Sequence, residues 1–149
     1  MKDFFQPDTL NDLVLRINKI SNESKPLWGV MNAAQMFAHC NEAFRSAVGK
    51  EKHPRAFMGR IVGRMALKSF TGPKPLKKNL PTAKEFKITS HREFEQEKKN
   101  LLVLVEQFSK GGPTSVSTHP HPFFGKMNHY DWNRLMYKHL DHHLQQFGV

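Results

Sequence analysis

Apolar residues recur every three or four positions in four separate stretches of the chain, and this spacing limits the fold more than any other feature. The first stretch carries Leu10, Leu13, Val14 and Ile17 at the i, i+3, i+4 and i+7 positions of an amphipathic helix. The others extend over Ala33–Val48, from Ser90 to Gly111, and from Asn128 to Phe147. Because each stretch has one apolar face to bury, the sequence predicts an all-α chain built as a four-helix bundle.

Residues that start and stop helices flank the four stretches. The expected N-caps are Asp8, Asn32, Ser90 and Asn128, and Gln35 and Glu93 would complete capping boxes with Asn32 and Ser90. The expected stops are Gly49, the Gly111-Gly112-Pro113 run and Gly148. The second and third helices are joined by a connection too long for a tight turn. Within it, Phe57–Phe70 is expected to form a short basic helix, and the prolines after it favour an extended path.

At 149 residues, the chain suits one domain spanning residues 1–149. No run approaches the ~20 apolar residues that span a bilayer, so we expect a soluble, cytoplasmic protein without a membrane partner. The lone cysteine, Cys40, cannot form an internal disulfide, which agrees with a reducing compartment. Its place at the centre of an apolar stripe predicts a buried core residue rather than a nucleophile.

Two histidines of the last stretch fall on its apolar face. At ~100° per residue, His139 and His143 share a side with Leu135 and Leu140, whereas His142 falls at the edge. A single inward histidine is usually a core residue with a hydrogen-bond partner, but two of them one turn apart can chelate one ion. We therefore expect His139 and His143 to be metal ligands, and His142 to be either a supporting residue beside them or a surface residue.

A third ligand is expected from another helix at the same depth, and His39 is the candidate. At ~1.5 Å per residue, His39 lies about 9 Å from the start of its helix, and His139 and His143 lie about 12 Å and 6 Å from the end of theirs. The three are level only if these two helices are antiparallel. His39 sits at the margin of its apolar stripe, so a partly exposed surface histidine is the alternative.

The same residues carry a resemblance. The run from His139-Leu-Asp-His-His143 to Gly148, with His121-Pro-Phe-Phe-Gly125 before it and Trp28-Gly29 before His39, resembles a single-domain branch of the DinB-like superfamily. The resemblance implies an up-down-down-up four-helix bundle, frequently a homodimer. It also implies one metal bound by a histidine of the second helix and a His-x-x-x-His pair of the fourth, which map onto His39, His139 and His143. Characterised members include metal-dependent transferases and isomerases that use low-molecular-weight thiols.

Three histidine nitrogens leave coordination positions open, as in catalytic rather than closed structural sites. Zinc, nickel and iron all suit this ligand set. The sequence therefore predicts a divalent-metal-dependent enzyme, a transferase or hydrolase whose ion activates a thiol or water. The resemblance to the DinB-like superfamily implies the thiol version, with a low-molecular-weight thiol as co-substrate. Glu42 is one turn from His39 but points away from the apolar stripe, so it is not expected to be a general base.

The formal charge of +10 is concentrated between residues 50 and 87, a segment with eleven Lys or Arg and only two glutamates. Arg60, Arg64 and Lys68 form a basic helical edge, which is either a solvated face or an anion-binding rim for an acidic small-molecule substrate. Two other functions stay open: a nucleic-acid-binding protein that uses the 50–87 segment, and a non-catalytic, stress-related metal-binding protein. A small-molecule partner is favoured over nucleic acid.

Overall fold

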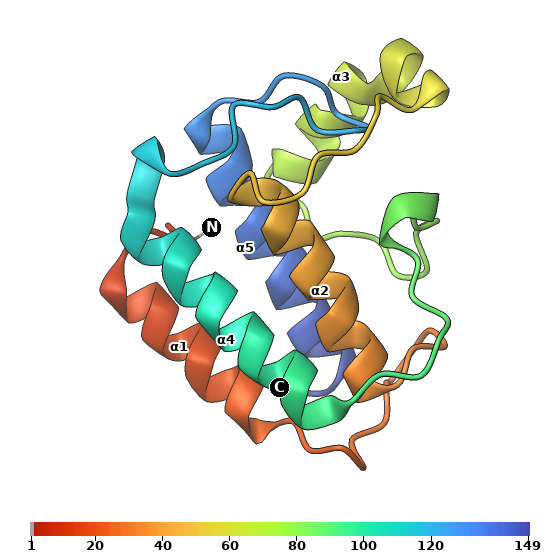
Figure 1. Ribbon diagram of the computed structural model, residues 1–149, viewed down its shortest axis with the longest axis vertical. Coiled ribbons are helices and arrows are strands. Elements are labelled where there is room, and N and C mark those ends of the chain that lie inside the picture. Colours follow the sequence, from red (N-terminus) through yellow and green to blue (C-terminus); the bar gives the residue numbers. More distant parts are fainter. Residues whose placement is uncertain (1) are drawn as a thin grey trace.

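The computed structural model describes residues 2–149, and all the regular structure among them is helical (Figure 1). The five α-helices are α1 (Pro7–Lys19), α2 (Ala33–Ala47), α3 (Phe57–Thr71), α4 (Phe94–Gly111) and α5 (His129–Gln146). Two 3₁₀ turns, η1 (Lys84–Phe86) and η2 (Gly112–Thr114), lie before and after α4. The prediction of an all-α chain is confirmed, and α3 is the short helix expected between the second and third long ones.

Local capping residues fix the beginnings of two helices. The side chain of Asn32 accepts a hydrogen bond from the Gln35 N–H at the start of α2, and Asn128 does the same with Asp131 at the start of α5. In both cases the third helical residue accepts from the cap's own N–H, which completes a capping box. Both predicted caps are thus confirmed.

Two other predicted helix starts were wrong. The N-cap of α1 is Gln6 rather than Asp8, because Pro7 occupies the first helical position, which its fixed φ favours. The N-cap of α4 is Glu93, so the helix begins later than the capping box at Ser90 predicted. The backbone carbonyl of Ser90 instead accepts a hydrogen bond from the Gln35 side chain, which ties this segment to α2.

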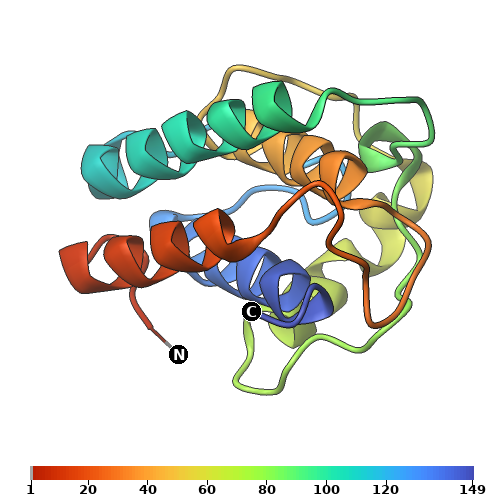
Figure 2. The ribbon, with the colours of Figure 1, turned by 90° about the horizontal axis from the view of Figure 1, so that it is seen from below.

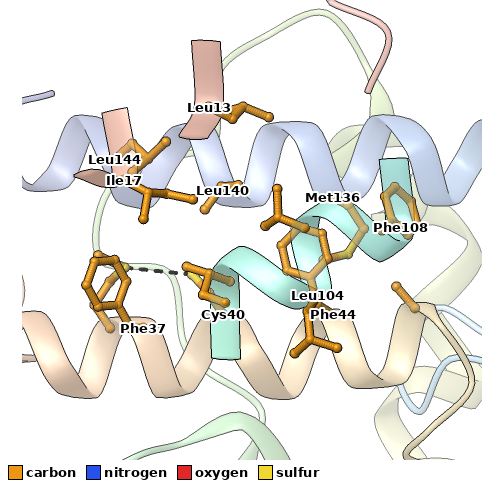
Figure 3. Packing of buried hydrophobic residues seen from close by; sticks show 14 of the residues in the cluster. Leu13, Ile17, Phe37, Cys40, Phe44, Leu104, Phe108, Met136, Leu140 and Leu144 are labelled. Carbon is orange, nitrogen blue, oxygen red and sulfur yellow. Dashed lines mark hydrogen bonds between the residues drawn. The ribbon is translucent and has the colours of Figure 1, made fainter. Parts of the chain in front are cut away.

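The hydrophobic core lies between α1, α2, α4 and α5, which Figure 2 shows as two layers of two helices. Figure 3 shows its central side chains meeting from all four helices, and these are Leu13, Ile17, Phe37, Cys40, Phe44, Leu104, Phe108, Met136, Leu140 and Leu144. Cys40 is fully buried there, as predicted. No helix within residues 2–149 has both the length and the apolar character needed to cross a membrane.

Hydrogen bonds between segments give the directions of α2, α4 and α5. Asn41 Nδ2 donates to Glu97 at 2.7 Å, and Lys50, just after α2, donates to Gln107, so α2 and α4 run the same way. The N–H of Leu27, before α2, donates to the carbonyl of Gln146 at the end of α5. The colours of Figure 1 show the same arrangement, with α5 opposed to α2. His39 therefore lies level with His139 and His143.

The helix α3 lies beside α5, outside the two layers (Figures 1 and 2). Gly59 and Gly63 let its backbone approach the loop before α5 closely, since a Cβ at Gly63 would lie 2.1 Å from the carbonyl oxygen of Phe123. Lys138 of α5 donates to the carbonyl of Gly72 at the other end of α3. These contacts fix which face of α3 points inward.

Candidate metal centre

Three histidines from two helices converge on one point between α2 and α5. The candidate ligand atoms of His39, His139 and His143 all lie within 4.8 Å of one another. The Nε2 atoms of His39 and His139 are 2.9 Å apart, and each pair of rings has a centroid separation of 4.8 Å. The structure thus brings together the three residues that helical periodicity and depth selected, in an arrangement that could hold a metal ion.

The site is mostly enclosed. His39 and His143 are buried, at 6 % and 8 % exposure, while His139 is partly exposed as a residue, although its Nδ1 is buried. His39 is covered by Phe86 of η1, which belongs to the long connection between α2 and α4. The alternative of a surface histidine was therefore wrong, because a helical wheel does not include the segment that crosses over it.

Hydrogen-bond partners fix the tautomers of two of the histidines. His39 Nδ1 lies 2.8 Å from the carbonyl oxygen of Phe86, which can only accept, so Nδ1 carries the proton. His143 Nδ1 lies 2.8 Å from Gln146 Oε1, and the same amide donates from Nε2 to the carbonyl of Trp28 at 2.6 Å. In both rings the lone pair is consequently on Nε2, directed into the site. Histidines that bind a metal through one ring nitrogen commonly donate a hydrogen bond from the other ring N–H to an oxygen in this way.

The third ring, His139, has no such partner. Its Nδ1 is buried without a hydrogen bond in the described chain, and its Nε2 faces the lone pair of His39. Either His139 donates its Nε2 proton to His39, or both nitrogens face a shared cation. Only the second arrangement uses all three Nε2 lone pairs.

Burial keeps these imidazoles neutral. Desolvation, with the charges of neighbouring histidines, lowers the pKa of His143 to about 3 and holds the pKa of His139 well below its usual value. The pKa of His39 is also lowered by burial. Metal ions bind the neutral form, so the ligand atoms are available without losing protons at neutral pH.

The spacing of the ligand atoms is compatible with a metal ion. At Zn–N distances of ~2.0–2.1 Å, two nitrogens of a tetrahedral site are about 3.4 Å apart. This separation lies between the 2.9 Å that separates the Nε2 atoms of His39 and His139 and the 4.8 Å within which all the candidate ligand atoms lie. The donor set fits a divalent ion.

Around the three histidines lies a rim that sequence reasoning largely missed. The indole of Trp28 is 5.5 Å from the ring of His142, and Lys78 Nζ stands 4.3 Å from the centroid of that indole. His142 makes no hydrogen bond to the three histidines within the described residues; Phe86 and Gln146 are the Nδ1 partners of His39 and His143. Burial lowers the pKa of His142, and the charge of Lys78 lowers it further.

The three residues of the predicted anion-binding rim, Arg60, Arg64 and Lys68, all belong to α3. Arg64 donates to the backbone carbonyl of Lys126 at 2.7 Å, and Arg60 and Lys68 are exposed on α3. None of the three has a hydrogen bond or ion pair with the histidines in the part of the chain that the structure describes. The basic side chain beside the candidate site is Lys78, which no spacing rule distinguished from its neighbours in the connection.

Other candidate groups take structural roles. Burial raises the pKa of the Cys40 thiol, and its Sγ lies 3.8 Å from Met36 Sδ. Glu42 pairs with Arg45. Across residues 2–149, no other cluster of three histidine, cysteine or acidic side chains is placed to share an ion.

Comparisons with known proteins identify a family but no activity. A search of curated proteins returned no match, and a search of solved structures returned none. The family described as "Protein of unknown function (DUF1569)" matches residues 3–148, nearly the whole chain. The chain therefore belongs to the DUF1569 family.

Proposed function

We propose that this protein is a divalent-metal-dependent enzyme whose ion is held by Nε2 of His39, His139 and His143. The observation that carries the proposal is the pair of fixed tautomers: Nδ1–H of His39 donates to Phe86 and Nδ1–H of His143 donates to Gln146, which leaves both Nε2 lone pairs free for an ion shared with His139. Burying three neutral imidazoles together is costly unless each nitrogen lone pair accepts a hydrogen bond or binds a cation. A shared ion supplies that partner.

The reaction we propose is the transfer of a thiol to an electrophile, or hydrolysis. A divalent ion with three histidine ligands keeps positions open and makes a bound thiol or water easier to deprotonate. Zinc, nickel or iron would suit the site, and a low-molecular-weight thiol is the proposed co-substrate.

The chain's own residues would orient the ion and shape the approach to it. The carbonyl of Phe86 and the amide of Gln146 hold two rings in place, and the connection over His39 limits access of water. His139 is the most exposed of the three histidines, and the flat indole of Trp28 and the cation of Lys78 lie on the side of His142. This rim suits a small anionic substrate.

The fold and assembly extend the proposal. The directions of α2, α4 and α5 support an up-down-down-up four-helix bundle like that of the DinB-like superfamily, with the long connection between α2 and α4 joining two parallel helices. We also propose that the protein acts in the cytoplasm as a homodimer, as the DinB-like resemblance implies.

Metal content of untagged protein tests the site. We expect about one ion per chain by mass spectrometry, and loss of that ion in both His139→Ala and His143→Ala. His142→Ala is the matched control, because His142 lies on the same helix and makes no hydrogen bond to the other three rings; it should keep its ion. Equal metal content in all four proteins, or none in any, would overturn the site.

Turnover tests the reaction separately. Metal-loaded protein is assayed for consumption of a low-molecular-weight thiol with a panel of anionic electrophiles and for ester hydrolysis, with His139→Ala as the blank. Activity that depends on the ion supports an enzyme. A bound ion without turnover of any kind would favour a non-catalytic metal-binding protein.

A further inference from the structure

The outer face of α3 carries a ridge of uncovered apolar side chains. Its members are Phe57 at 74 % exposure, Met58 at 55 %, Ile61 at 64 % and Met65 at 72 %. At ~100° per residue these four span about one quarter of the helix circumference. A helix with an apolar outer ridge as well as a buried inner face has one face without a partner in the described chain.

The inner face of α3 is fixed, so the ridge cannot turn inward. A Cβ at Gly59 or Gly63 would approach the carbonyl oxygen of Phe123 to 2.4 or 2.1 Å, and Leu67 on the same face is buried. Arg55, just before the helix, donates to the carbonyls of Pro122 and Gly59. The ridge is therefore held on the outside of the molecule; Figure 1 shows α3 itself at the edge of the ribbon.

Positive charge flanks the ridge. Arg60 and Arg64 fall beside the apolar side chains on the helix circumference, and Lys68 continues their arc at the C-terminal end of the ridge. None of the three forms an ion pair within residues 2–149. The surrounding segment, residues 50–87, carries eleven Lys or Arg and only two Glu. The face thus offers four apolar side chains and an excess of cations together.

Charge complementarity selects the partner. A second copy of the chain docked through the same ridge would bring the flanking cations of both copies together, which opposes self-association. Nucleic acid would satisfy the cations but would leave the apolar ridge in contact with phosphate and water. An anionic bilayer surface satisfies both, because acyl chains accept the ridge and acidic headgroups accept Arg and Lys.

We propose that α3 docks this protein on anionic membrane surfaces, lying in the plane of the interface. The absence of a spanning helix does not bear on this mode, since a surface helix inserts only one face. The proposal is independent of the metal site, which lies between α2 and α5.

Vesicle co-sedimentation tests the proposal with two matched pairs of variants. Ile61→Ser/Met65→Ser removes half of the ridge, and Leu15→Ser/Val103→Ser makes equivalent changes at exposed mid-helix positions of α1 and α4. Arg60→Gln/Lys68→Gln removes flanking charge, and Lys25→Gln/Lys99→Gln removes the same charge elsewhere on the surface. Circular dichroism checks that each variant is folded. If Ile61→Ser/Met65→Ser does not fold, the comparison of Arg60→Gln/Lys68→Gln with Lys25→Gln/Lys99→Gln decides the test.

We expect binding to phosphatidylserine vesicles and little binding to phosphatidylcholine vesicles. Binding should weaken at least about tenfold in Ile61→Ser/Met65→Ser and about fivefold for each cation removed at Arg60 and Lys68, with both controls unchanged. Unaltered binding in the α3 variants would overturn the proposal. Two other results, each without vesicle binding, would also overturn it. One is a dimer that dissociates in Ile61→Ser/Met65→Ser, and the other is salt-sensitive binding to a DNA duplex.

Discussion

At the scale of single residues, Gln146 connects the candidate metal centre to the segment before α2. Its amide accepts from His143 and donates to the carbonyl of Trp28, at 2.8 Å and 2.6 Å. Gln146→Ala would free the His143 ring to turn and would leave buried polar atoms without partners. We expect this variant to bind zinc about ten- to a hundredfold more weakly, measured by competition with a chromophoric chelator.

The neighbouring residue provides the control for this substitution. Gln145 is exposed and donates to Asp141 on the far side of α5, so Gln145→Ala should bind zinc like the unaltered protein. Equal weakening in both variants would mean that damage to the end of α5, and not the lost contact with His143, reduces the affinity.

Sequence reasoning could find only the parts of this site that follow from helical geometry. His139 and His143 are one turn apart on an apolar face, and Gln146, three residues after His143, could have been found by the same periodicity. The other Nδ1 partner is the backbone carbonyl of Phe86, from the connection over α2. A carbonyl is present in every residue, so no residue pattern singles it out.

At the scale of elements, the packing of α3 depends on a glycine where an alanine would normally be better. In an exposed helix interior, Gly→Ala stabilises by about 1 kcal/mol. At Gly63, however, a Cβ would lie 2.1 Å from the backbone oxygen of Phe123, which cannot move without shifting the loop before α5. We expect Gly63→Ala to destabilise the protein by about 1–3 kcal/mol in urea unfolding.

The sign of the change makes this prediction decisive. Ser69→Ala, at an exposed position of the same helix, serves as the reference for a gain in helix propensity without a clash. Should Gly63→Ala raise the midpoint as Ser69→Ala does, α3 would not be packed on Phe123 as described.

The helix boundaries show why some elements could be predicted and others not. Asn32 and Asn128 cap helices through contacts three residues away, which a sequence reveals directly. Ser90 has the same local pattern but is bound to Gln35, a residue far from it in the chain, so the helix starts later. Local signals fail where tertiary contacts compete for the same backbone groups.

At the scale of the whole molecule, stability should depend on pH through His121. Burial, with the charges of His53 and Arg55, lowers its pKa from an ordinary 6.5 to about 4. The pKa of His121 is lower in the folded than in the unfolded protein. The contribution of neutral His121 to the free energy of unfolding is therefore fully present above pH 6.5 and is lost as the pH falls through 4. Between pH 7 and pH 4 we expect a loss of about 3 kcal/mol in the free energy of unfolding.

His121→Asn isolates that contribution. His121 Nδ1 accepts from the N–H groups of Phe123 and Phe124, and the Asn side-chain oxygen can accept at the same place without titrating. In chelator, which removes any metal, the other buried histidines contribute equally to both proteins. The variant should be less stable at neutral pH but lose about 3 kcal/mol less on acidification. Parallel pH curves would contradict a buried, neutral His121.

The distance along the chain between His39 and its partners has a consequence for biosynthesis. His39 and His139 are 100 residues apart in sequence. At roughly 5–20 residues per second, a ribosome adds the second histidine about 5–20 s after the first. Throughout that interval the growing polypeptide presents one imidazole without its partners. The complete site therefore appears only after α5 has emerged and packed against α2, so any ion it takes must be acquired after synthesis of this region rather than during it.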